Sequence, residues 1–193
     1  SDLGKNIIRR KKENRSEGSL IEITIEALKT EDVLHRLPDQ TIYGEKLEEK
    51  LYNVALELCI TWVNRILFLK LLEGQLVNYH QDRDQRFLNS KMIHDFDELF
   101  KLFHKVLAVN IPDRTESIRA KYGKVPYLNS SLFEISPLED QTIKINALDN
   151  GSQLEIIGTT ILKTVKKKVD KLPILDYFFQ FLDSYDFASE GNE

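Results

Sequence analysis

The longest hydrophobic pattern in the chain covers about residues 44–79. Apolar residues recur there every three, four or seven positions, which is the spacing of one helix face. This face consists of Leu47, Leu51, Val54, Leu58, Trp62, Leu69, Leu72 and Leu76. A second apolar set comprises Leu56, Ile60, Val63, Leu67 and Leu71. Because a helix that is apolar nearly all round is surrounded by protein, the pattern predicts one long buried helix over about 44–79.

A second amphipathic helix is predicted in the middle of the chain. Apolar residues repeat at i, i+3 and i+4 after Ser90 and Asp95, either of which could cap the helix. The repeat consists of Phe96, Leu99, Phe100, Phe103, Val106 and Leu107. Asn110 and Pro112 end it. Two helices with apolar faces of this size are stable only when packed together, which indicates a helical bundle.

Three further helices are predicted outside this pair. A short one begins at Thr30 and stops before Pro38. Another covers residues 159–172 and carries one apolar stripe, formed by Ile161, Val165, Val169 and Leu172. Pro173 suits the first turn of a last, aromatic helix over residues 174–182.

Alternating apolar residues predict only a small amount of β-structure. A weak strand pattern covers Leu20 to Ile25. A stronger one flanks Asp149-Asn150-Gly151, a tripeptide whose Asn and Gly accept the positive φ of a tight hairpin turn. The alternating residues are Ile143, Ile145 and Ala147 before the turn and Leu154 and Ile156 after it. The predicted fold is therefore mainly α, a helical bundle around the long helix, with a small β-hairpin over about 142–157.

The 193 residues suit a single domain with its own core. Residues 1–19 are polar and basic, and we expect a tether or an arm there, with a solvated linker as the simpler alternative. Residues 20–183 are expected to form the helical domain, and residues 184–193 a polar tail. The chain begins without Met and ends in this tail, as an excised piece of a longer protein would.

The net charge of −4 gives the chain no overall attraction to nucleic acid, so any DNA contact must come from a local basic patch. The candidates for contacts with the DNA backbone are Lys163, Lys166, Lys167, Lys168 and Lys171, with the basic arm second. Clustered lysines bind phosphate without base specificity. The alternative is that this lysine-rich face is only solvated. Since no aromatic platform accompanies it, a single-strand binding surface is disfavoured.

The single cysteine, Cys59, excludes an internal disulfide framework and most zinc sites. Its apolar surroundings predict a small core residue rather than a reactive thiol. The basic N-terminus is not followed by an apolar run, as a signal peptide would require. The most hydrophobic segment contains Glu57, Arg65 and Lys70, whereas a membrane span needs about 20 mostly apolar residues. We therefore expect a cytoplasmic protein.

The sequence lacks the patterns of the common catalytic and cofactor sites. Its eight glycines are scattered, so they form no phosphate-binding loop. His94 and His104 are ten residues apart on one predicted helix and cannot share a small ion. The Glu-x-Lys strings lie in a helical segment rather than on strands. Ser130-Ser131 alone suggests a hydrolase. We expect no catalysis, no metal and no cofactor in this chain.

Asn64 and Arg65 interrupt the long apolar helix. A buried arginine is costly unless it is paired, so Arg65 must either find partners or reach the surface. We predict a structural clasp in which Asn64 and Arg65 hold the loop over residues 126–134. In this loop Asn129 can bond to backbone, while Tyr127 and Phe133 anchor it. The alternative is a direct contact of Asn64 and Arg65 with DNA or with a catalytic domain.

Two segments together resemble a known family. The first is Thr-Trp-Val-Asn-Arg-Ile-Leu-Phe-Leu-Lys-Leu-Leu-Glu over residues 61–73, and the second is Val-Pro-Tyr-Leu-Asn-Ser-Ser-Leu-Phe-Glu over residues 125–134. They are similar to the helical connector region of type IIG restriction-modification enzymes, fused nuclease–adenine methyltransferases, and of related phage-defence DNA adenine methyltransferases. Ser130-Ser131 replaces the more usual Gly-Gly of that family. The run over residues 184–189 is similar to the stretch that leads into the methyltransferase domain.

The resemblance implies a non-catalytic connector that positions a nuclease and a methyltransferase domain of the same polypeptide, with double-stranded DNA as a further candidate partner. It also implies that the parent protein uses S-adenosylmethionine and Mg²⁺, although the motifs that bind them are missing here. Two alternatives remain, an independent DNA-binding module and a protein-interaction adaptor.

Overall fold

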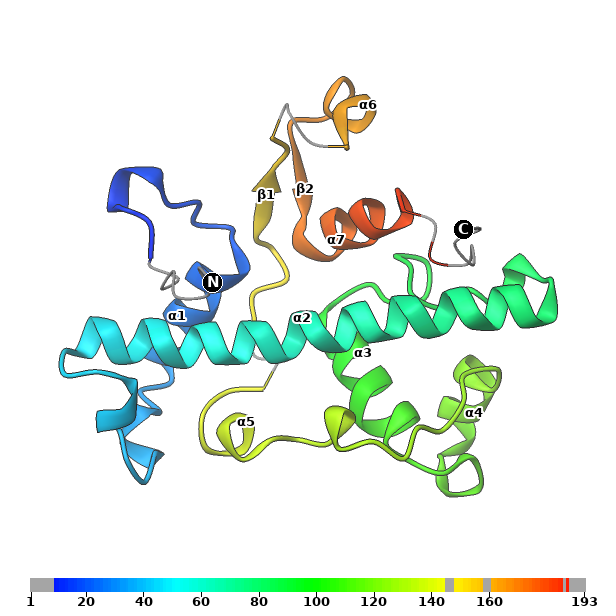
Figure 1. Cartoon of the computed structure of the whole chain (residues 1–193), viewed down its shortest axis with the longest axis horizontal. Helices are drawn as coiled ribbons and strands as arrows, with labels where there is room; N and C mark the ends of the chain where they lie inside the picture. The colour runs from blue at the N-terminus through cyan, green and yellow to red at the C-terminus, as the bar shows by residue number, and fades with distance from the viewer. Residues whose placement is uncertain (1–8, 145–147, 158–160, 186, 188–193) are drawn as a thin grey trace, which may run out of the picture.

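The computed structural model describes residues 9–144, 148–157, 161–185 and 187. In this part of the chain, seven α-helices and one two-stranded antiparallel sheet are arranged around a single long helix, α2 (Leu47–His80; Figure 1). The prediction of a mainly α fold with a long central helix and a small β-hairpin is confirmed. None of the described helices is both long enough and apolar enough to cross a membrane.

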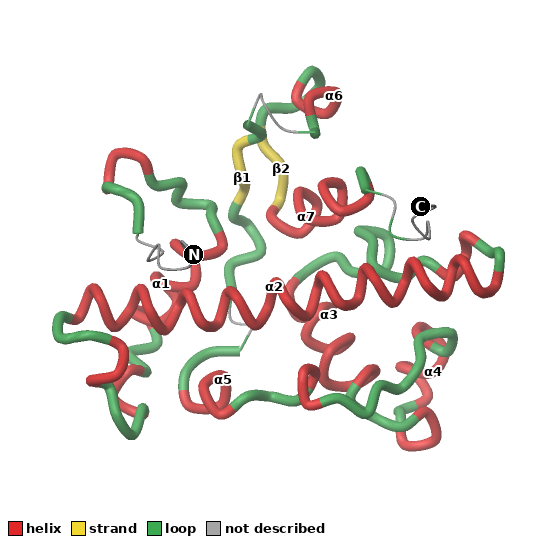
Figure 2. The backbone as a smooth tube through the Cα atoms, in the orientation of Figure 1, coloured by secondary structure: helices red, strands yellow, loops and turns green. Residues whose placement is uncertain are grey.

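The long helix has clear start and stop signals. A carboxylate oxygen of Glu49 accepts hydrogen bonds from the backbone N–H groups of Glu45 and Lys46, at 3.2 and 3.3 Å. Gln81 adopts a left-handed conformation (φ 51°) that ends the helix. Its 34 residues give α2 a length of about 50 Å. In Figure 2, α1, α7 and the sheet lie on one side of this rod, and α3, α4 and α5 lie on the other.

The core forms where these two layers meet α2. Trp62 packs against Phe178 of α7 (Ile174–Asp183) with ring centroids 5.0 Å apart, and against Phe96 of α3 (Phe96–Lys101) at 6.1 Å. Five residues of the first predicted apolar face are buried, namely Leu51, Val54, Leu58, Trp62 and Leu69, whereas Leu47 of that face is exposed. One face of α2 lies between the two layers and stays open. There Ile60, Leu67, Phe68 and Leu71 are exposed, so protein does not surround the helix on every side as predicted.

The first helix, α1 (Leu20–Thr30), occupies the segment where a strand was expected, and that prediction is wrong. Its buried residues, among them Leu20, Ile23, Thr24 and Leu28, follow the helical spacing, whereas the alternation through Ile25 is incidental. No α-helix begins at Thr30, because Asp32 adopts a left-handed conformation (φ 47°) that a right-handed helix cannot contain. Between it and Pro38 the structure has only a 3₁₀ turn, Leu34–Arg36.

The sheet pairs different residues from those predicted. β1 (Gln153–Glu155) pairs with β2 (Lys171–Pro173), with Leu154 opposite Leu172, and Ile143 is not in a strand. Ile145 and Ala147 lie outside the described residues. A turn does form at Asn150-Gly151, but neither residue has the predicted positive φ, and the Asn150 side chain accepts a hydrogen bond from the Phe96 N–H at 2.9 Å. The turn therefore fastens a loop to the start of α3 instead of closing a hairpin.

The predicted helix over residues 159–172 is also wrong, because only α6 (Lys163–Lys166) is helical and Lys171 and Leu172 belong to β2. Together β1, α6 and β2 form what we call the lobe, which projects at the top of Figure 1. It has a small apolar cluster of its own, built on Ile156, Leu162 and Leu172.

The other helices largely follow the sequence. Asp95 caps α3 by accepting from the Glu98 N–H at 2.7 Å, and the helix continues as a π-helix, Leu102–Leu107. α7 follows Pro173 as predicted. α4 (Glu116–Tyr122) and α5 (Pro137–Gln141) are short helices that the apolar pattern did not predict.

The basic segment before α1 lies on the body of the protein from residue 9 onward. Arg9 forms an ion pair with Glu22 of α1. A Cβ on Gly18 would lie 1.9 Å from the carbonyl oxygen of Gln153, so this segment and β1 touch through their backbones. At the other end, a Cβ on Gly74 of α2 would lie 2.5 Å from the carbonyl oxygen of Phe187. Residues 1–8 of the predicted arm and most of the predicted tail lie outside the described residues.

Candidate functional site

Arg65 of α2 is the centre of a buried polar cluster. Its side chain is fully buried and forms a bidentate ion pair with Glu139 of α5, with nitrogen–oxygen distances of 2.5 and 2.7 Å. Its remaining hydrogen bonds go to the loop before α5. Nε donates to the carbonyl of Leu132 at 2.6 Å and Nη2 donates to the carbonyl of Glu134 at 2.8 Å. One guanidinium thus holds a loop and a helix that lie 67 to 74 residues away in sequence.

His104 completes this cluster by binding the carbonyl of Phe133, which lies between the two carbonyls that Arg65 holds. Its Nδ1 lies 2.7 Å from the carbonyl oxygen of Phe133, which can only accept, so Nδ1 carries the proton of the neutral ring. Its Nε2 is buried without a hydrogen-bond partner among the described residues. Burial lowers the pKa of His104, and the nearby charge of Arg65 lowers it further. The imidazole is therefore held neutral.

Glu139 has a second task at the start of α5. Its carboxylate accepts from the Ser136 N–H at 2.9 Å, while the Ser136 hydroxyl accepts from the Glu139 N–H at 3.2 Å. This is a capping box, which satisfies two free N–H groups of the helix. Burial by itself would raise the pKa of Glu139, but Arg65 and the Ser136 N–H lower it. The carboxylate is therefore ionised, as its pairing with Arg65 requires.

The residues of the predicted clasp lie in different environments. Phe133 is buried, with its ring 5.8 Å from that of Phe68 and 5.9 Å from that of Phe103. Tyr127 is half-buried and donates to the side-chain oxygen of Asn129 at 3.3 Å. Asn64 and Asn129 are both exposed, and no hydrogen bond joins them in the part of the chain that the structure describes. The clasp is thus built on Arg65 and on the carbonyls of the loop.

Sequence reasoning missed two members of the cluster, Glu139 and His104. The Ser-x-x-Glu spacing of Ser136 and Glu139 is a capping-box signal that could have located the helix start. It would not have shown that Glu139 also faces Arg65. His104 carries no local signal, because its position on an apolar helix is also compatible with an ordinary core histidine.

A second buried ion network lies about one and a half turns further along α2. Lys70 bonds to Glu73 at 2.6 Å and to Asp183 of α7 at 2.5 Å. The other oxygen of Glu73 accepts from the backbone N–H groups of Phe87 and Leu88, at 2.8 and 2.7 Å. This network fastens α7 and the chain after α2 to the same rod.

Arg114 is a third buried cation, and it binds carbonyl groups rather than a carboxylate. Its guanidinium donates to the carbonyls of Val109, Val125 and Tyr122, at 3.1, 2.8 and 3.5 Å. Desolvation by burial lowers its pKa. Since carbonyls at helix ends carry partial negative charge, Arg114 joins the end of the π-helix to the end of α4.

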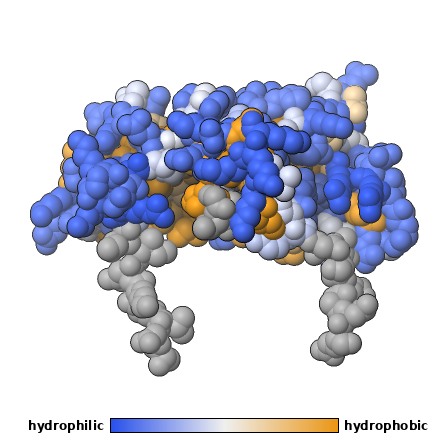
Figure 3. Space-filling model, turned by 90° about the horizontal axis from the view of Figure 1, so that it is seen from above, coloured by the Kyte–Doolittle hydropathy of each residue, from blue (hydrophilic) through white to orange (hydrophobic). Residues whose placement is uncertain are grey.

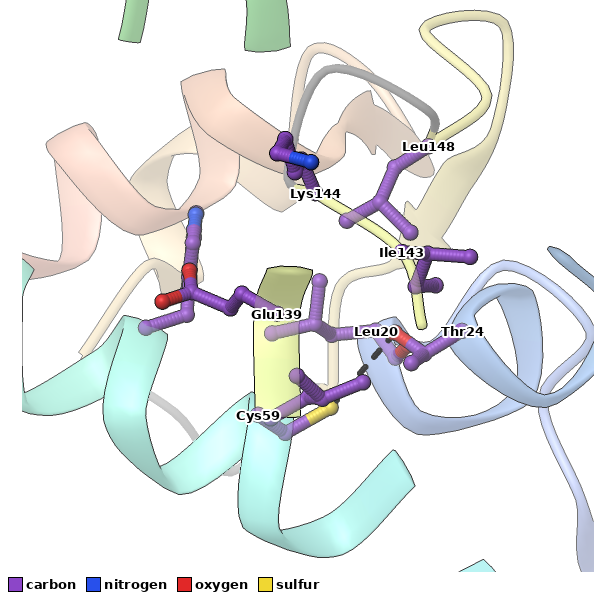
Figure 4. Close-up of a pocket in the computed structure, with 9 residues that line it drawn as sticks. Leu20, Thr24, Cys59, Glu139, Ile143, Lys144 and Leu148 are labelled. Carbon is purple, nitrogen blue, oxygen red and sulfur yellow. Dashed lines mark hydrogen bonds between the residues drawn. The ribbon is translucent and has the colours of Figure 1, made fainter. Parts of the chain in front are cut away.

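Cys59 lies beside a cavity of about 30 Å³ between α1, α2 and the segment after α5 (Figure 4). The figure shows Thr24 and Cys59 facing each other, with 3.6 Å between the hydroxyl oxygen and the sulfur. Such a volume holds no more than about one or two water molecules. Burial raises the pKa of the Cys59 thiol to about 11, so the thiol is protonated and unreactive at neutral pH.

Two larger open grooves flank the exposed face of α2. The lobe-side groove, about 770 Å³, lies between the segment before α1, α2, the lobe and α7. Its lining includes Arg9, Tyr52, Leu56, Val63, Tyr177 and Phe178. The loop-side groove, about 350 Å³, is lined in part by Ile42, Tyr43, Glu57, Thr61 and Leu138. Seen from the side of the lobe, the surface is mostly hydrophilic, with hydrophobic patches toward the middle (Figure 3).

The candidate lysines gather on the lobe although their predicted helix is broken. Lys163, Lys167, Lys168 and Lys171 are exposed. Lys166 instead donates to the carbonyl of Ile156 at 2.5 Å. The five lysines of residues 163–171 are accompanied in the described lobe by two acidic residues, Glu155 and Asp170. The lobe is therefore basic within an acidic chain.

Neither a metal site nor an activated nucleophile is found in the described ranges. No three His, Cys, Asp or Glu side chains lie close enough together there to hold a metal ion. The hydroxyl of Ser130 accepts from the Leu132 N–H at 3.3 Å and caps a 3₁₀ turn, Ser131–Phe133. The clasp and the Lys70 network join segments far apart in sequence, and Arg114 joins neighbouring helix ends. None of the three exposes a reactive group.

Comparison with known proteins places the chain in a family without assigning an activity. No curated protein and no solved structure matches it. A family model described as a domain of unknown function (DUF7814) matches residues 1–193, so the chain belongs to that family.

Proposed function

We propose that this chain is a non-catalytic connector in a DNA adenine methyltransferase of the restriction-modification type, and that it holds a nuclease and a methyltransferase domain apart. The observation that carries the proposal is that the segment before α1 is fastened to α1, which packs along α2, while Phe187 after α7 touches α2 itself. The resemblance of residues 61–73 and 125–134 to the connectors of type IIG enzymes supplies the context. S-adenosylmethionine and Mg²⁺ are then bound by the flanking domains.

The spacing follows from the geometry of α2. Arg9 lies on the wall of the groove that also contains Tyr52, near the start of α2. Phe187 touches α2 at Gly74. Tyr52 and Gly74 are 22 positions apart, which corresponds to about 33 Å along a helix. Arg9 and Phe187, the first and last described residues, therefore lie about 30 Å apart along the axis, and we propose that flanking domains are held at about this spacing.

The buried ion pairs give this spacer its rigidity. Breaking one partner of such a pair costs about 3–5 kcal/mol, because the other charge is left buried and unpaired. Arg65 fixes the loop before α5, and Lys70 fixes α7. Both lie on the same 34-residue helix, so motions of the two layers relative to α2 are opposed at two separate points.

The test is the sequence and the activity of the full gene product. We expect a Mg²⁺-dependent nuclease motif before this chain and an Asn/Asp-Pro-Pro-Tyr/Phe motif after it. We also expect the full gene product to be cytoplasmic and to methylate adenine in duplex DNA. A full gene product that lacks both motifs and does not methylate DNA would overturn the proposal.

The basic lobe favours a second role, contact with the phosphate backbone of duplex DNA held between the two domains. Four exposed lysines, Lys163, Lys167, Lys168 and Lys171, are available for this. Each phosphate contact adds about one to the slope of log affinity against log salt. Mobility shifts over a salt series should therefore show a slope about two smaller for a Lys163→Gln/Lys167→Gln variant. A Lys29→Gln/Lys50→Gln variant, changed away from the lobe, should match the original chain. Absence of any shift would leave only the spacer role.

A further inference from the structure

The exposed face of α2 reverses the usual distribution of polar and apolar side chains. Within Ile60–Leu71, every residue of which the structure describes, the two charged side chains, Arg65 and Lys70, are buried in ion pairs. The exposed positions are Ile60, Asn64, Leu67, Phe68 and Leu71, which we call the outer face. The four apolar ones are 40–51% exposed. This face therefore presents hydrophobic surface and one amide to the solvent, without an exposed charge.

The spacing on the outer face is that of a coiled-coil seam. Ile60, Asn64, Leu67 and Leu71 follow one another at steps of four, three and four residues, as alternating d and a positions do. Leu56 and Val63 then occupy g positions, and Phe68 occupies an e position, so that apolar residues widen the seam. Asn64 is the one amide within it. A single Asn at an a position is a known device for fixing register and partner number in helix pairs.

We propose that the outer face pairs with the same face of a second copy of this chain, with the two α2 helices parallel and in register. In this arrangement Asn64 meets its counterpart, and each amide can donate to the carbonyl of the other. An antiparallel pair would set Asn64 against Leu67 and leave a buried amide without a partner, which is costly. The proposal rests on this face alone and is independent of the proposed function.

The chemistry of the face selects a protein over DNA as the occupant. Phosphate needs cations, and the outer face has none exposed. Within Ile60–Leu71 two identical faces carry no exposed charge to repel each other, and the heptad spacing makes them complementary under two-fold symmetry. The exposed Glu57 occupies the preceding a position, so the seam begins only at Ile60.

The surface beside the seam can enlarge the contact. Two heptads alone bury little area, whereas a standard interface buries about 800 Å² on each partner. The lobe-side groove begins at Leu56 and Val63, directly beside the seam, and is lined further by Tyr177 and Phe178. The apolar surface of α2 therefore continues into a groove that a second copy can reach.

Sedimentation equilibrium of the chain up to about 100 µM tests the pairing. We expect a reversible dimer, and we expect Leu67→Glu to weaken it by about thirtyfold or more, because a charge is then buried at the centre. Ile111→Glu is the matched control, since Ile111 is 45% exposed and belongs to the 3₁₀ turn Ile111–Asp113 instead of α2, and it should leave the dimer intact. A monomer at the highest concentration, or a dimer that resists Leu67→Glu, would overturn the proposal.

Asn64→Asp provides a second variant that keeps the side-chain shape. Since Asn64 is exposed in the single chain, this change should leave the fold intact and dissociate the dimer by placing two like charges together. Thermal melts of both variants check that loss of the dimer does not come from unfolding. A dimer unchanged by Asn64→Asp would contradict an interface centred on this residue.

A spin label on Asn78→Cys, in a Cys59→Ser background, reports the direction of pairing. In a parallel pair in register, the two labels lie at the same level and give a short distance. In an antiparallel pair centred between Asn64 and Leu67, position 78 would face position 53 of the other copy, about 37 Å away along the axis. A distance of that size would rule out the parallel arrangement.

Discussion

The pairing of Arg65 with Glu139 is the residue-scale feature on which the clasp depends. The guanidinium is desolvated, and its hydrogen bonds all go to the loop and helix that it holds. A buried pair of this kind adds little net stability over an apolar pair of the same size, but it is very costly to break from one side. Its contribution is therefore to specify one position for the end of the loop over residues 126–134 and for the start of α5.

Replacing Arg65 should reveal that cost. We expect Arg65→Met to lower the free energy of unfolding by about 3–5 kcal/mol, because Glu139 is left buried with an unpaired charge. Urea denaturation measures the change. Asn64→Ala, one residue away but exposed in the single chain, should change it by less than about 0.5 kcal/mol at a protein concentration low enough for the chain to be monomeric. The double variant Arg65→Met/Glu139→Gln should recover part of the loss. Equal effects of Asn64→Ala and Arg65→Met would contradict a clasp built on Arg65.

His104 should make the stability depend on pH near neutrality. The folded protein lowers the pKa of His104 below its ordinary value of 6.5, so only the unfolded chain binds a proton there as the pH falls below about 6.5. We therefore expect the free energy of unfolding to decrease between about pH 7 and pH 5. In His104→Asn, whose amide can still donate to the Phe133 carbonyl, this decrease should be reduced.

His94→Asn is the control, because His94 is exposed and the variant should keep the full decrease. The half-buried Glu98 and the buried Glu139, carboxylates whose pKa is lowered, do not contribute in this pH range. Lys121, Lys101 and Tyr122 overcome the effect of burial and lower the pKa of Glu98 to about 2, and the pKa of Glu139 is also lowered. Their stabilisation is lost only as the pH falls below about 4.5. A stability independent of pH between 7 and 5 would refute the role assigned to His104.

At this scale, the sequence could show that a residue needs a partner but not which partner it finds. Arg65 stands in an apolar helix and must be paired if buried, which follows from desolvation alone. Glu139 lies 74 positions away, and nothing local connects the two. Asn64 is adjacent to Arg65 in the sequence yet points to solvent, because successive side chains on a helix differ in direction by about 100°.

At the scale of elements, long periodic segments were predictable and short ones were not. The apolar spacing placed α2, α3 and α7 because each buries a continuous face. The apolar residues of the α1 segment fit both the alternating pattern of a strand and the spacing of a helix. Packing against α2 favours the helix. The sheet is only three residues long on each side, so its pairing depends on Leu154 and Leu172 meeting in the fold and not on the Asn-Gly turn.

The contact between the segment before α1 and β1 can be tested at Gly18. Any Cβ there would lie 1.9 Å from the Gln153 carbonyl oxygen, and backbone must then move. We expect Gly18→Ala to lower the free energy of unfolding by about 1–3 kcal/mol, as overpacking does. Gly151→Ala is the matched control, because its Cβ would come no closer than 3.2 Å to the Asp149 side chain and should cost less than about 0.5 kcal/mol. Equal stabilities in denaturant would show that the segment does not rest on β1.

At the scale of the whole molecule, the buried charges and the exposed apolar residues of α2 have complementary consequences. Arg65 and Lys70 point inward and fix the two layers, whereas Ile60, Leu67 and Leu71 point outward. A connector needs both properties, a rigid internal frame and surface through which it can meet other proteins. The ion pairs form the frame, and the outer face is one exposed apolar surface of α2.

The central hypothesis is that this chain positions chemistry carried out elsewhere in a longer protein. Isothermal titration of S-adenosylmethionine into the chain alone and into the full gene product tests it most directly. We predict no measurable binding by residues 1–193 and binding by the full product, with a Kd in roughly the micromolar range. Tight binding by the chain alone, or none by the full product, would contradict the connector hypothesis.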